Sequence, residues 1–212
     1  MEQGTIIFLN GTSSAGKSSI AKVLQEIMDG YFIHTGIDHF IERLPRKFFA
    51  GHEGIDPPPA VGELWVSEKG GGRLIEIRVG PVGYKVIAGI YHAVAGLARS
   101  GNDVIVDDVI YDPLVLKSAV TALHTCNVLF VGVRCPVDVA DQRERERGDR
   151  MPGLVTAHID LVHAHGIYDL DVDTSVLTAM ECAEKIKERL LSGPLPNAFQ
   201  HLHAVMAAVE HR

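Results

Sequence analysis

The sequence predicts one α/β domain in which a five-stranded parallel sheet lies between two layers of helices. Short apolar runs alternate along the chain with longer amphipathic segments, which is the order that βαβ units produce. A length of 212 residues is enough for one such domain but not for two ordinary domains and a linker. A glycine-rich motif that binds phosphate directly follows the first apolar run.

Five segments have the composition of strands. Three of them are nearly continuous apolar runs, as expected for strands that are covered on both faces, and these should be central in the sheet. The three runs are 5–10, 103–107 and 127–133, and the two weaker strands are 31–35 and 168–172.

Five segments between and after these strands have helical patterns. In the second of them the apolar residues recur every three or four positions, and the segment ends at Ser100 and Gly101, a typical helix stop. Asp112 followed by Pro113 is a typical helix start. The expected helices are 17–28, 84–99, 113–124, 137–147 and 176–191.

Composition excludes several classes of protein. The formal charge is −7 with a pI near 5.8, which argues against binding to a nucleic-acid backbone. No apolar run reaches the roughly 18 residues of a membrane span, and the start of the chain does not resemble a secretory signal, so we expect a cytoplasmic protein. The three cysteines lack metal-site spacing and are expected to be reduced core thiols.

The motif GxxxxGK[ST] stands between the first expected strand and the first expected helix. Its glycines let backbone N–H groups converge on a phosphate, and the helix N-terminus adds about half a positive charge. Lys17 is expected to reach the β- and γ-phosphates of ATP, and the Ser18 hydroxyl to hold Mg²⁺. This motif places the fold among the three-layer α/β/α P-loop NTPases. The expected nucleotide-binding residues are Gly11, Thr12, Ser13, Ser14, Ala15, Gly16, Lys17, Ser18 and Ser19.

Carboxylates follow two of the other expected strands, at the edge where ligands of open α/β sheets bind. Asp107 and Asp108 end a strand, and at least one of them is expected to help hold Mg²⁺, although either could cap a turn. Asp38 follows the second strand, where it could take a proton from an acceptor hydroxyl or cap a helix over 40–44.

Arginines are concentrated between positions 134 and 150, where five of the twenty basic residues fall. Interleaved acidic residues make a solvated, salt-bridged helix the simplest explanation for part of this run. A glycine interrupts it near its end, which favours a lid over 143–150. We expect Arg143 to contact the nucleotide, and Arg147 and Arg150 to neutralise the transferred phosphoryl group.

The chain resembles the chloramphenicol phosphotransferase family of small P-loop kinases. The resemblance rests on IIFLNGTSSAGKSSI, HTGIDHFIERLP, VIVDDV, VLFVGVRCPVDVADQRERERGDR and VHAHGIYDLDVDTS, which occur in this order. It implies a fold like that of nucleoside monophosphate kinases, ATP and Mg²⁺ as cofactors, and transfer to a hydroxyl of an antibiotic or similar apolar alcohol. It also implies that Asp38 is the base that deprotonates this hydroxyl.

The expected organisation is a kinase domain over 1–192 and a helical extension over 193–212. An insertion at 48–83 should lie on the substrate side, and eight of the 13 aromatic residues fall between positions 31 and 91, which suits an apolar acceptor pocket. Apolar residues of the extension share one helical face that could dock on the body or form a homo-oligomer contact.

Two other functions stay open. A kinase of a metabolite or nucleoside would use the same phosphate loop with a different acceptor. A nucleotide-binding regulator would need the loop but no acceptor. The expected partner is therefore a small-molecule hydroxyl acceptor, with neither nucleic acid nor membrane involved.

Overall fold

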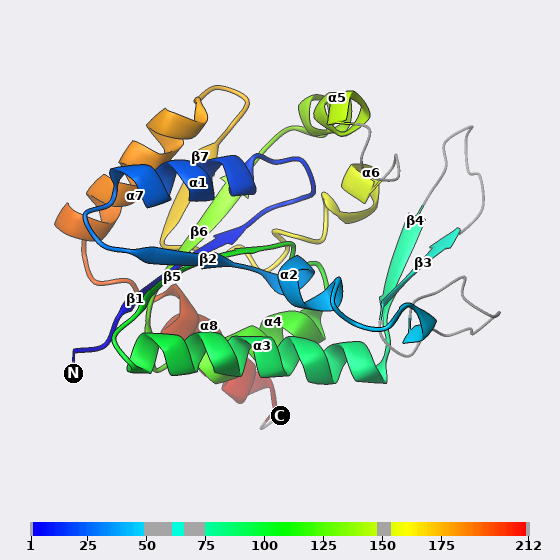
Figure 1. Cartoon of the computed structure of the whole chain (residues 1–212), viewed down its shortest axis with the longest axis horizontal. Helices are drawn as coiled ribbons and strands as arrows, with labels where there is room; N and C mark the ends of the chain where they lie inside the picture. Colours follow the sequence, from blue (N-terminus) through cyan, green and yellow to red (C-terminus); the bar gives the residue numbers. More distant parts are fainter. Residues whose placement is uncertain (1, 49–60, 66–74, 148–153, 211–212) are drawn as a thin grey trace.

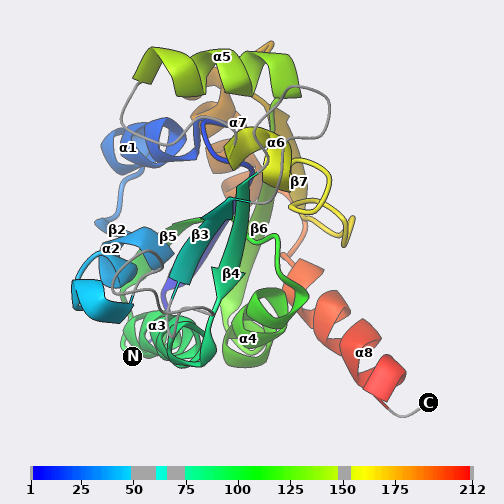
Figure 2. The same ribbon diagram turned by 90° about the vertical axis from the view of Figure 1, so that its right-hand side faces the viewer.

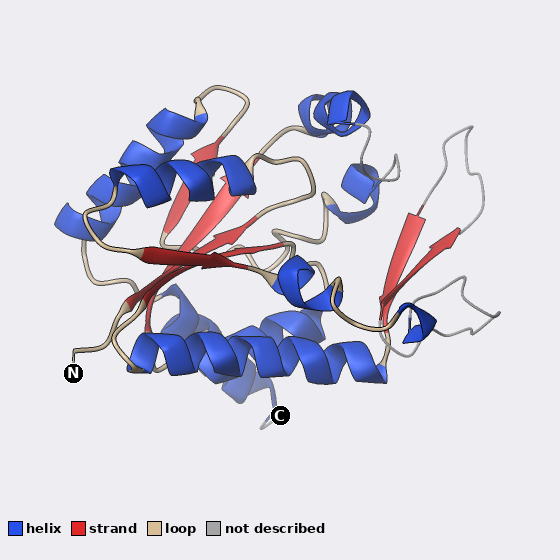
Figure 3. Cartoon of the chain, viewed as in Figure 1, coloured by secondary structure: helices blue, strands red, loops and turns tan. Residues whose placement is uncertain are grey.

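A parallel sheet of five strands forms the centre of the molecule, and helices cover both of its faces (Figures 1 and 3). The computed structural model describes residues 2–48, 61–65, 75–147 and 154–210. This architecture confirms the predicted three-layer α/β/α class. The strands in spatial order are β2 (Phe32–Thr35), β5 (Asp103–Asp108), β1 (Thr5–Asn10), β6 (Asn127–Arg134) and β7 (Leu170–Asp173).

The three interior strands are those that the sequence marks as continuous apolar runs. Their parallel register aligns Leu9 of β1 with Asp107 of β5, and Asn10 with Asp108. The two carboxylates therefore lie beside the last residues of β1, where the phosphate loop begins. The edge strand β7 starts at Leu170 rather than at Tyr168, which instead points its hydroxyl at Asn10.

One face of the sheet is covered by α1 (Lys17–Ile27) and α7 (Ala179–Ser192). The other face is covered by α3 (Pro81–Arg99), α4 (Pro113–Leu123) and α8 (Ala198–Glu210). Helix α3 begins three residues before the predicted start, because Pro81 can occupy the first turn, where its missing N–H has no intrahelical partner to lose.

The core divides into two clusters, one on each face of the sheet. Phe8 and Phe130 meet edge to face beneath α3, α4 and α8, with ring centroids 5.5 Å apart. Leu9 and Ile20 belong to the cluster beneath α1 and α7. Strand residues thus alternate between the two clusters, as the pleat requires.

Smaller elements lie beyond the carboxyl ends of the strands (Figures 1 and 2). The insertion at 48–83 contains an antiparallel hairpin, and its residues 49–60 and 66–74 lie outside the described residues. The elements at this edge are α2 (Ile37–Ile41), the 3₁₀ turn η1 (Arg46–Phe48), β3 (Val61–Trp65), β4 (Ile75–Val79), α5 (Val137–Arg147) and α6 (Leu154–His158).

The C-terminal helix α8 docks through its first half. Phe199 and Leu202 are buried against α4 and the sheet, whereas Val205 and Val209 are exposed where α8 extends from the body (Figure 2). A homo-oligomer contact on this outer half stays a prediction. The three cysteines are buried and unpaired. Among the described helices, none has the length and apolar character that a membrane span requires.

Candidate active site

The phosphate loop connects β1 to α1 and depends on two close backbone approaches. A Cβ atom at Gly11 would lie 2.5 Å from the Val133 carbonyl oxygen, so only glycine fits there. Gly16 has a φ of +91°, in the left-handed region that favours glycine. The Lys17 Nζ atom donates to the Thr12 carbonyl at 2.9 Å and thus lies over the loop.

Ser18 and Asp107 meet beside this loop. The Ser18 hydroxyl donates to Asp107 Oδ2 at 2.6 Å, and Lys17 Nζ lies 3.8 Å from the other carboxylate oxygen. Burial alone would raise the pKa of Asp107, but the His34 imidazole, the Lys17 charge and the Ser18 hydroxyl together hold the pKa below its ordinary value. His34 Nε2 is 3.6 Å from Oδ2, too long for a hydrogen bond.

An ionised carboxylate beside a hydroxyl is a ligand pair of the kind that Mg²⁺ prefers. The pair of Ser18 and Asp107 is therefore suited to hold this ion at the phosphate loop. The neighbouring carboxylate, Asp108, does not face Ser18.

The Asp108 side chain points to the face of the sheet opposite to that of Asp107. Its Oδ1 atom accepts the Ile37 backbone N–H at 2.6 Å, and its Oδ2 atom accepts the Tyr91 hydroxyl at 3.1 Å. Complete burial raises the pKa of Asp108 to about 7. The sequence left both aspartates as metal candidates, but the geometry brings only Asp107 to Ser18.

Asp38 lies in the first turn of α2, one residue after the backbone N–H that Asp108 accepts. Gly36 occupies the N-cap position, so Asp38 does not cap a helix that starts at residue 40. The Asp38 side chain is exposed and lines a cavity of about 510 Å³ together with Lys17, Ser18 and Asp107. Apolar or aromatic side chains also line this cavity, namely Ile37, Ile41, Val79, Ile87, Val109, Tyr111, Val115 and His158.

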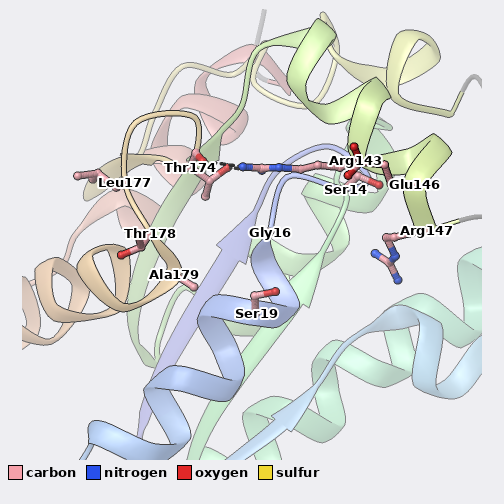
Figure 4. Close-up of a pocket in the computed structure, with 10 residues that line it drawn as sticks. All are labelled: Ser14, Gly16, Ser19, Arg143, Glu146, Arg147, Thr174, Leu177, Thr178 and Ala179. Atoms are coloured by element: carbon pink, nitrogen blue, oxygen red, sulfur yellow. Dashed lines mark hydrogen bonds between the residues drawn. The ribbon is translucent and has the colours of Figure 1, made fainter.

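Arg143 and Arg147 extend from α5 on the other side of the phosphate loop (Figure 4). Arg143 donates to the Thr174 hydroxyl at 3.0 Å and to the Thr174 carbonyl at 2.7 Å. The Thr174 hydroxyl in turn donates to the Ala15 carbonyl at 2.8 Å, which links α5 to the loop. Arg150 lies outside the described residues.

A second cavity, of about 430 Å³, adjoins these arginines. Arg147 lines both this cavity and the one that contains Asp38, so it stands between them. Sequence reasoning missed the residues after β7 that form one wall, although their position beyond the last strand of the sheet could have indicated them. The lining residues are Ser14, Gly16, Ser19, Arg143, Glu146, Arg147, Thr174, Leu177, Thr178 and Ala179 (Figure 4).

Asn10 is another residue that sequence reasoning missed. Its side chain accepts the Ile110 N–H at 2.9 Å and donates to the Val162 carbonyl at 2.9 Å and the Tyr168 hydroxyl at 2.8 Å. This buried amide connects the strand before the phosphate loop to the segments that follow β5 and α6. A polar residue that ends an apolar strand is the signal that could have revealed it.

The strand order, the phosphate loop after β1 and the arginine-bearing helix α5 together define the class of P-loop kinase folds. A family model of chloramphenicol phosphotransferase-like proteins matches residues 4–191. The chain therefore belongs to this family, which confirms the predicted family and the prediction of a phosphotransferase.

Similar proteins support the same assignment. Relatives from two strains of Mycobacterium tuberculosis, both named as O-phosphotransferases, are 34% identical over 206 residues, covering 95% of this chain and 89% of theirs. The fold is similar to that of a tunicamycin resistance protein from Deinococcus radiodurans, with a TM-score of 0.58, 19% identity, and coverage of 88% of this chain and 96% of that one. It is also similar to that of shikimate kinase from Acinetobacter baumannii, with a TM-score of 0.56, 18% identity, and coverage of 92% and 97%.

Proposed function

We propose that the protein transfers the γ-phosphoryl group of ATP to a hydroxyl of a small, largely apolar alcohol, such as an antibiotic. One observation carries this proposal. A single cavity is lined by Lys17, Ser18 and Asp107 of the phosphate-loop site, by Asp38, and by several apolar side chains. Such a cavity can hold a triphosphate and an acceptor side by side.

The triphosphate would bind to residues 11–19, with the nucleotide base in the cavity beside Arg143. Thr174 supports this arrangement because it anchors Arg143 to the phosphate loop. A guanidinium plane held by two hydrogen bonds offers a flat surface for a base, while Leu177 offers an apolar contact. Arg143 would thus contact the nucleotide rather than move with a lid.

Ser18 and Asp107 are the residues that would hold Mg²⁺. When bound, this ion would neutralise charge on the β- and γ-phosphates. Lys17 would add a fixed positive charge at the same phosphates, and Arg147 would approach the transferred group from between the two cavities. Arg150 is proposed to contribute in the same way.

In the transfer step, the acceptor oxygen forms a bond to the γ-phosphorus, and the bond from this phosphorus to the β,γ-bridging oxygen breaks to leave ADP. The hydroxyl proton passes to the Asp38 carboxylate. Asp38 suits this role because its side chain is exposed, whereas Asp108, which lines the same cavity, is buried and accepts hydrogen bonds from Ile37 and Tyr91. The chain's own contribution is mainly to position the two substrates and to stabilise charge.

The acceptor end of the cavity favours an uncharged molecule. Ile41, Val79 and Ile87 provide apolar contacts, and the carboxylates of Asp38 and Glu42 line the same cavity. An acidic acceptor would be repelled by these carboxylates, whereas a neutral alcohol with an apolar body would not.

The test is ADP release by the purified protein with ATP and Mg²⁺ against a panel of alcohols. The panel contains chloramphenicol and other hydroxylated antibiotics, nucleosides, and anionic metabolites such as shikimate, and mass spectrometry checks for the phosphorylated product. Stimulation by an apolar antibiotic supports the proposal, whereas stimulation by nucleosides or anionic metabolites alone favours a metabolic kinase. A regulator would show no stimulation by any alcohol.

A further inference from the structure

We propose that Asp108 is a positioning residue that holds Asp38 in place by fastening the start of α2 to the end of β5. This inference rests on the proposed role of Asp38 as the proton acceptor. It gives Asp108 a task different from that of Asp107, although the two are neighbours in the sequence.

The contact between Asp108 and α2 is short and buried. Only 3% of Asp108 is exposed, and its Oδ1 atom lies 2.6 Å from the Ile37 backbone nitrogen. Ile37 directly precedes Asp38, so this hydrogen bond fixes the chain one residue from the proposed base. A hydrogen bond that is shielded from water is stronger than the same bond at the surface.

The backbone before α2 lies equally close to β5. A Cβ atom at Gly36 would lie 2.2 Å from the Asp107 carbonyl oxygen and 3.2 Å from Asp108 Oδ1. There is no room for a side chain at this position. The start of α2 is therefore pressed against the end of β5, and Asp108 supplies the polar contact within that junction.

Helix α2 needs such an anchor. It has only five residues, fewer than a helix needs to be stable by itself, and its N-cap residue is a glycine that has no side chain to accept a hydrogen bond. Asp108 accepts the first N–H of the helix from a neighbouring strand and so performs the task of a capping side chain.

Tyr91 holds the carboxylate from the opposite side. This fully buried residue of α3 donates its hydroxyl to Asp108 Oδ2 at 3.1 Å. Asp108 is thus fixed between α3 and α2, whereas Asp107 is directed at Ser18 on α1. Two successive residues of β5 therefore determine where Asp38 lies relative to the proposed Mg²⁺ site, and small displacements of reacting groups lower rates strongly.

The experiment compares Asp108→Ala and Asp108→Asn with a control on the same strand. Asn can still accept the Ile37 N–H through its oxygen and can donate to Tyr91, so it should preserve the junction, while Ala removes both contacts. The control is Asp103→Ala, because Asp103 accepts the Thr5 N–H at 2.7 Å at the opposite end of β5. The full chain is used, and thermal unfolding confirms that each variant is folded.

The first measurement is hydrogen exchange of the backbone amides of α2, which needs no acceptor. We expect at least about tenfold faster exchange at the amides of Ile37, Ile41 and Glu42 in Asp108→Ala, and no change there in Asp108→Asn or Asp103→Ala. Unchanged exchange in a folded Asp108→Ala protein would overturn the inference, because α2 would then not depend on this carboxylate.

The second measurement is a kinetic cycle with Asp38→Asn, using the panel alcohol with the highest turnover. We expect Asp108→Ala to lower kcat by about 10- to 100-fold with little change in the KM for ATP, and Asp108→Asn to stay within about threefold of the unmodified protein. In the Asp38→Asn background, Asp108→Ala should lower kcat by less than about threefold, because the base it positions is already lost.

Three results would contradict the positioning role. Full additivity in the cycle would show that Asp108 acts independently of Asp38. If kcat falls in both Asp108 variants and a higher Mg²⁺ concentration restores it, Asp108 is a metal ligand. Wild-type turnover by Asp38→Ala would show that Asp38 is not the base, so that no residue is needed to position it. The hydrogen-exchange data would then show separately whether Asp108 anchors α2.

Discussion

The buried imidazole of His158 predicts a loss of stability in mild acid. His158 ends α6, is only 4% exposed, and stacks on the Tyr111 ring with centroids 4.1 Å apart and an interplanar angle of 11°. Burial lowers the pKa of His158 to about 4, from an ordinary value of 6.5. The folded protein therefore keeps this side chain neutral at a pH where the unfolded chain binds a proton.

The size of the effect follows from this difference in pKa. Above pH 6.5 both states are neutral and the full stability is present. Between pH 6.5 and pH 4 the His158 side chain becomes protonated in the unfolded state, while in the folded state it stays mostly neutral until the pH approaches 4. The difference of about 2.5 between the two pKa values corresponds to a loss of about 3 kcal/mol in the free energy of unfolding. Burial also lowers the pKa of His163 and of His165 to about 4, so both add to the loss in the same direction.

Comparison with His158→Phe isolates the contribution of this one residue. Phenylalanine can still stack on Tyr111 but does not titrate. The free energy of unfolding of both proteins is measured with urea at several pH values between about 7.5 and about 4. As the pH falls over this range, the unmodified protein should lose about 3 kcal/mol more than His158→Phe does. The exposed His201→Phe serves as a control. A difference that stays constant over this range would refute the reasoning, because protonation of His158 would then not be linked to unfolding.

Four further predictions concern the candidate site. Lys17→Ala should abolish phosphoryl transfer and weaken ATP binding measured by calorimetry, and unchanged turnover would contradict the phosphate-loop assignment. Arg147→Ala should lower kcat more than it weakens ATP binding, since its charge is needed most in the transition state; steady-state kinetics with wild-type values would contradict this. Asp38→Asn should keep ATP affinity while transfer falls by about 10²-fold or more, and a folded Asp38→Ala protein with full activity would mean that the base lies elsewhere. Asp107→Asn should raise the Mg²⁺ concentration needed for nucleotide binding, and an unchanged Mg²⁺ titration would remove Asp107 from the metal site.

The parts of the fold that the sequence could predict are those with local signals. Continuous apolar runs identified the interior strands, and the glycine-lysine motif identified the phosphate loop with Lys17 and Ser18. Asp112 caps α4 by accepting the Leu114 N–H, as its position before Pro113 predicted. Each of these features depends on residues that are close together in the chain.

The contacts that could not be predicted join residues far apart in the chain. Thr174 reaches Arg143 and Ala15 only because β7 ends beside the phosphate loop, and no local pattern in the sequence reports this. Similarly, Asn10 meets Tyr168 across 158 positions of sequence. Such contacts depend on strand order and register, which propensity and periodicity do not determine.

The different directions of Asp107 and Asp108 follow from the pleat of β5. Val104 and Val106 pack in the cluster beneath α3, whereas Ile105 packs in the cluster beneath α1. Because successive side chains of a strand point to opposite faces, Asp107 must continue toward α1 and Ser18, and Asp108 toward α3 and Tyr91. The two carboxylates cannot exchange tasks, since a shift of one residue would also turn the apolar residues of β5 away from their clusters. Asp108 is therefore not a reserve ligand that could replace Asp107, even though the two are adjacent and chemically identical.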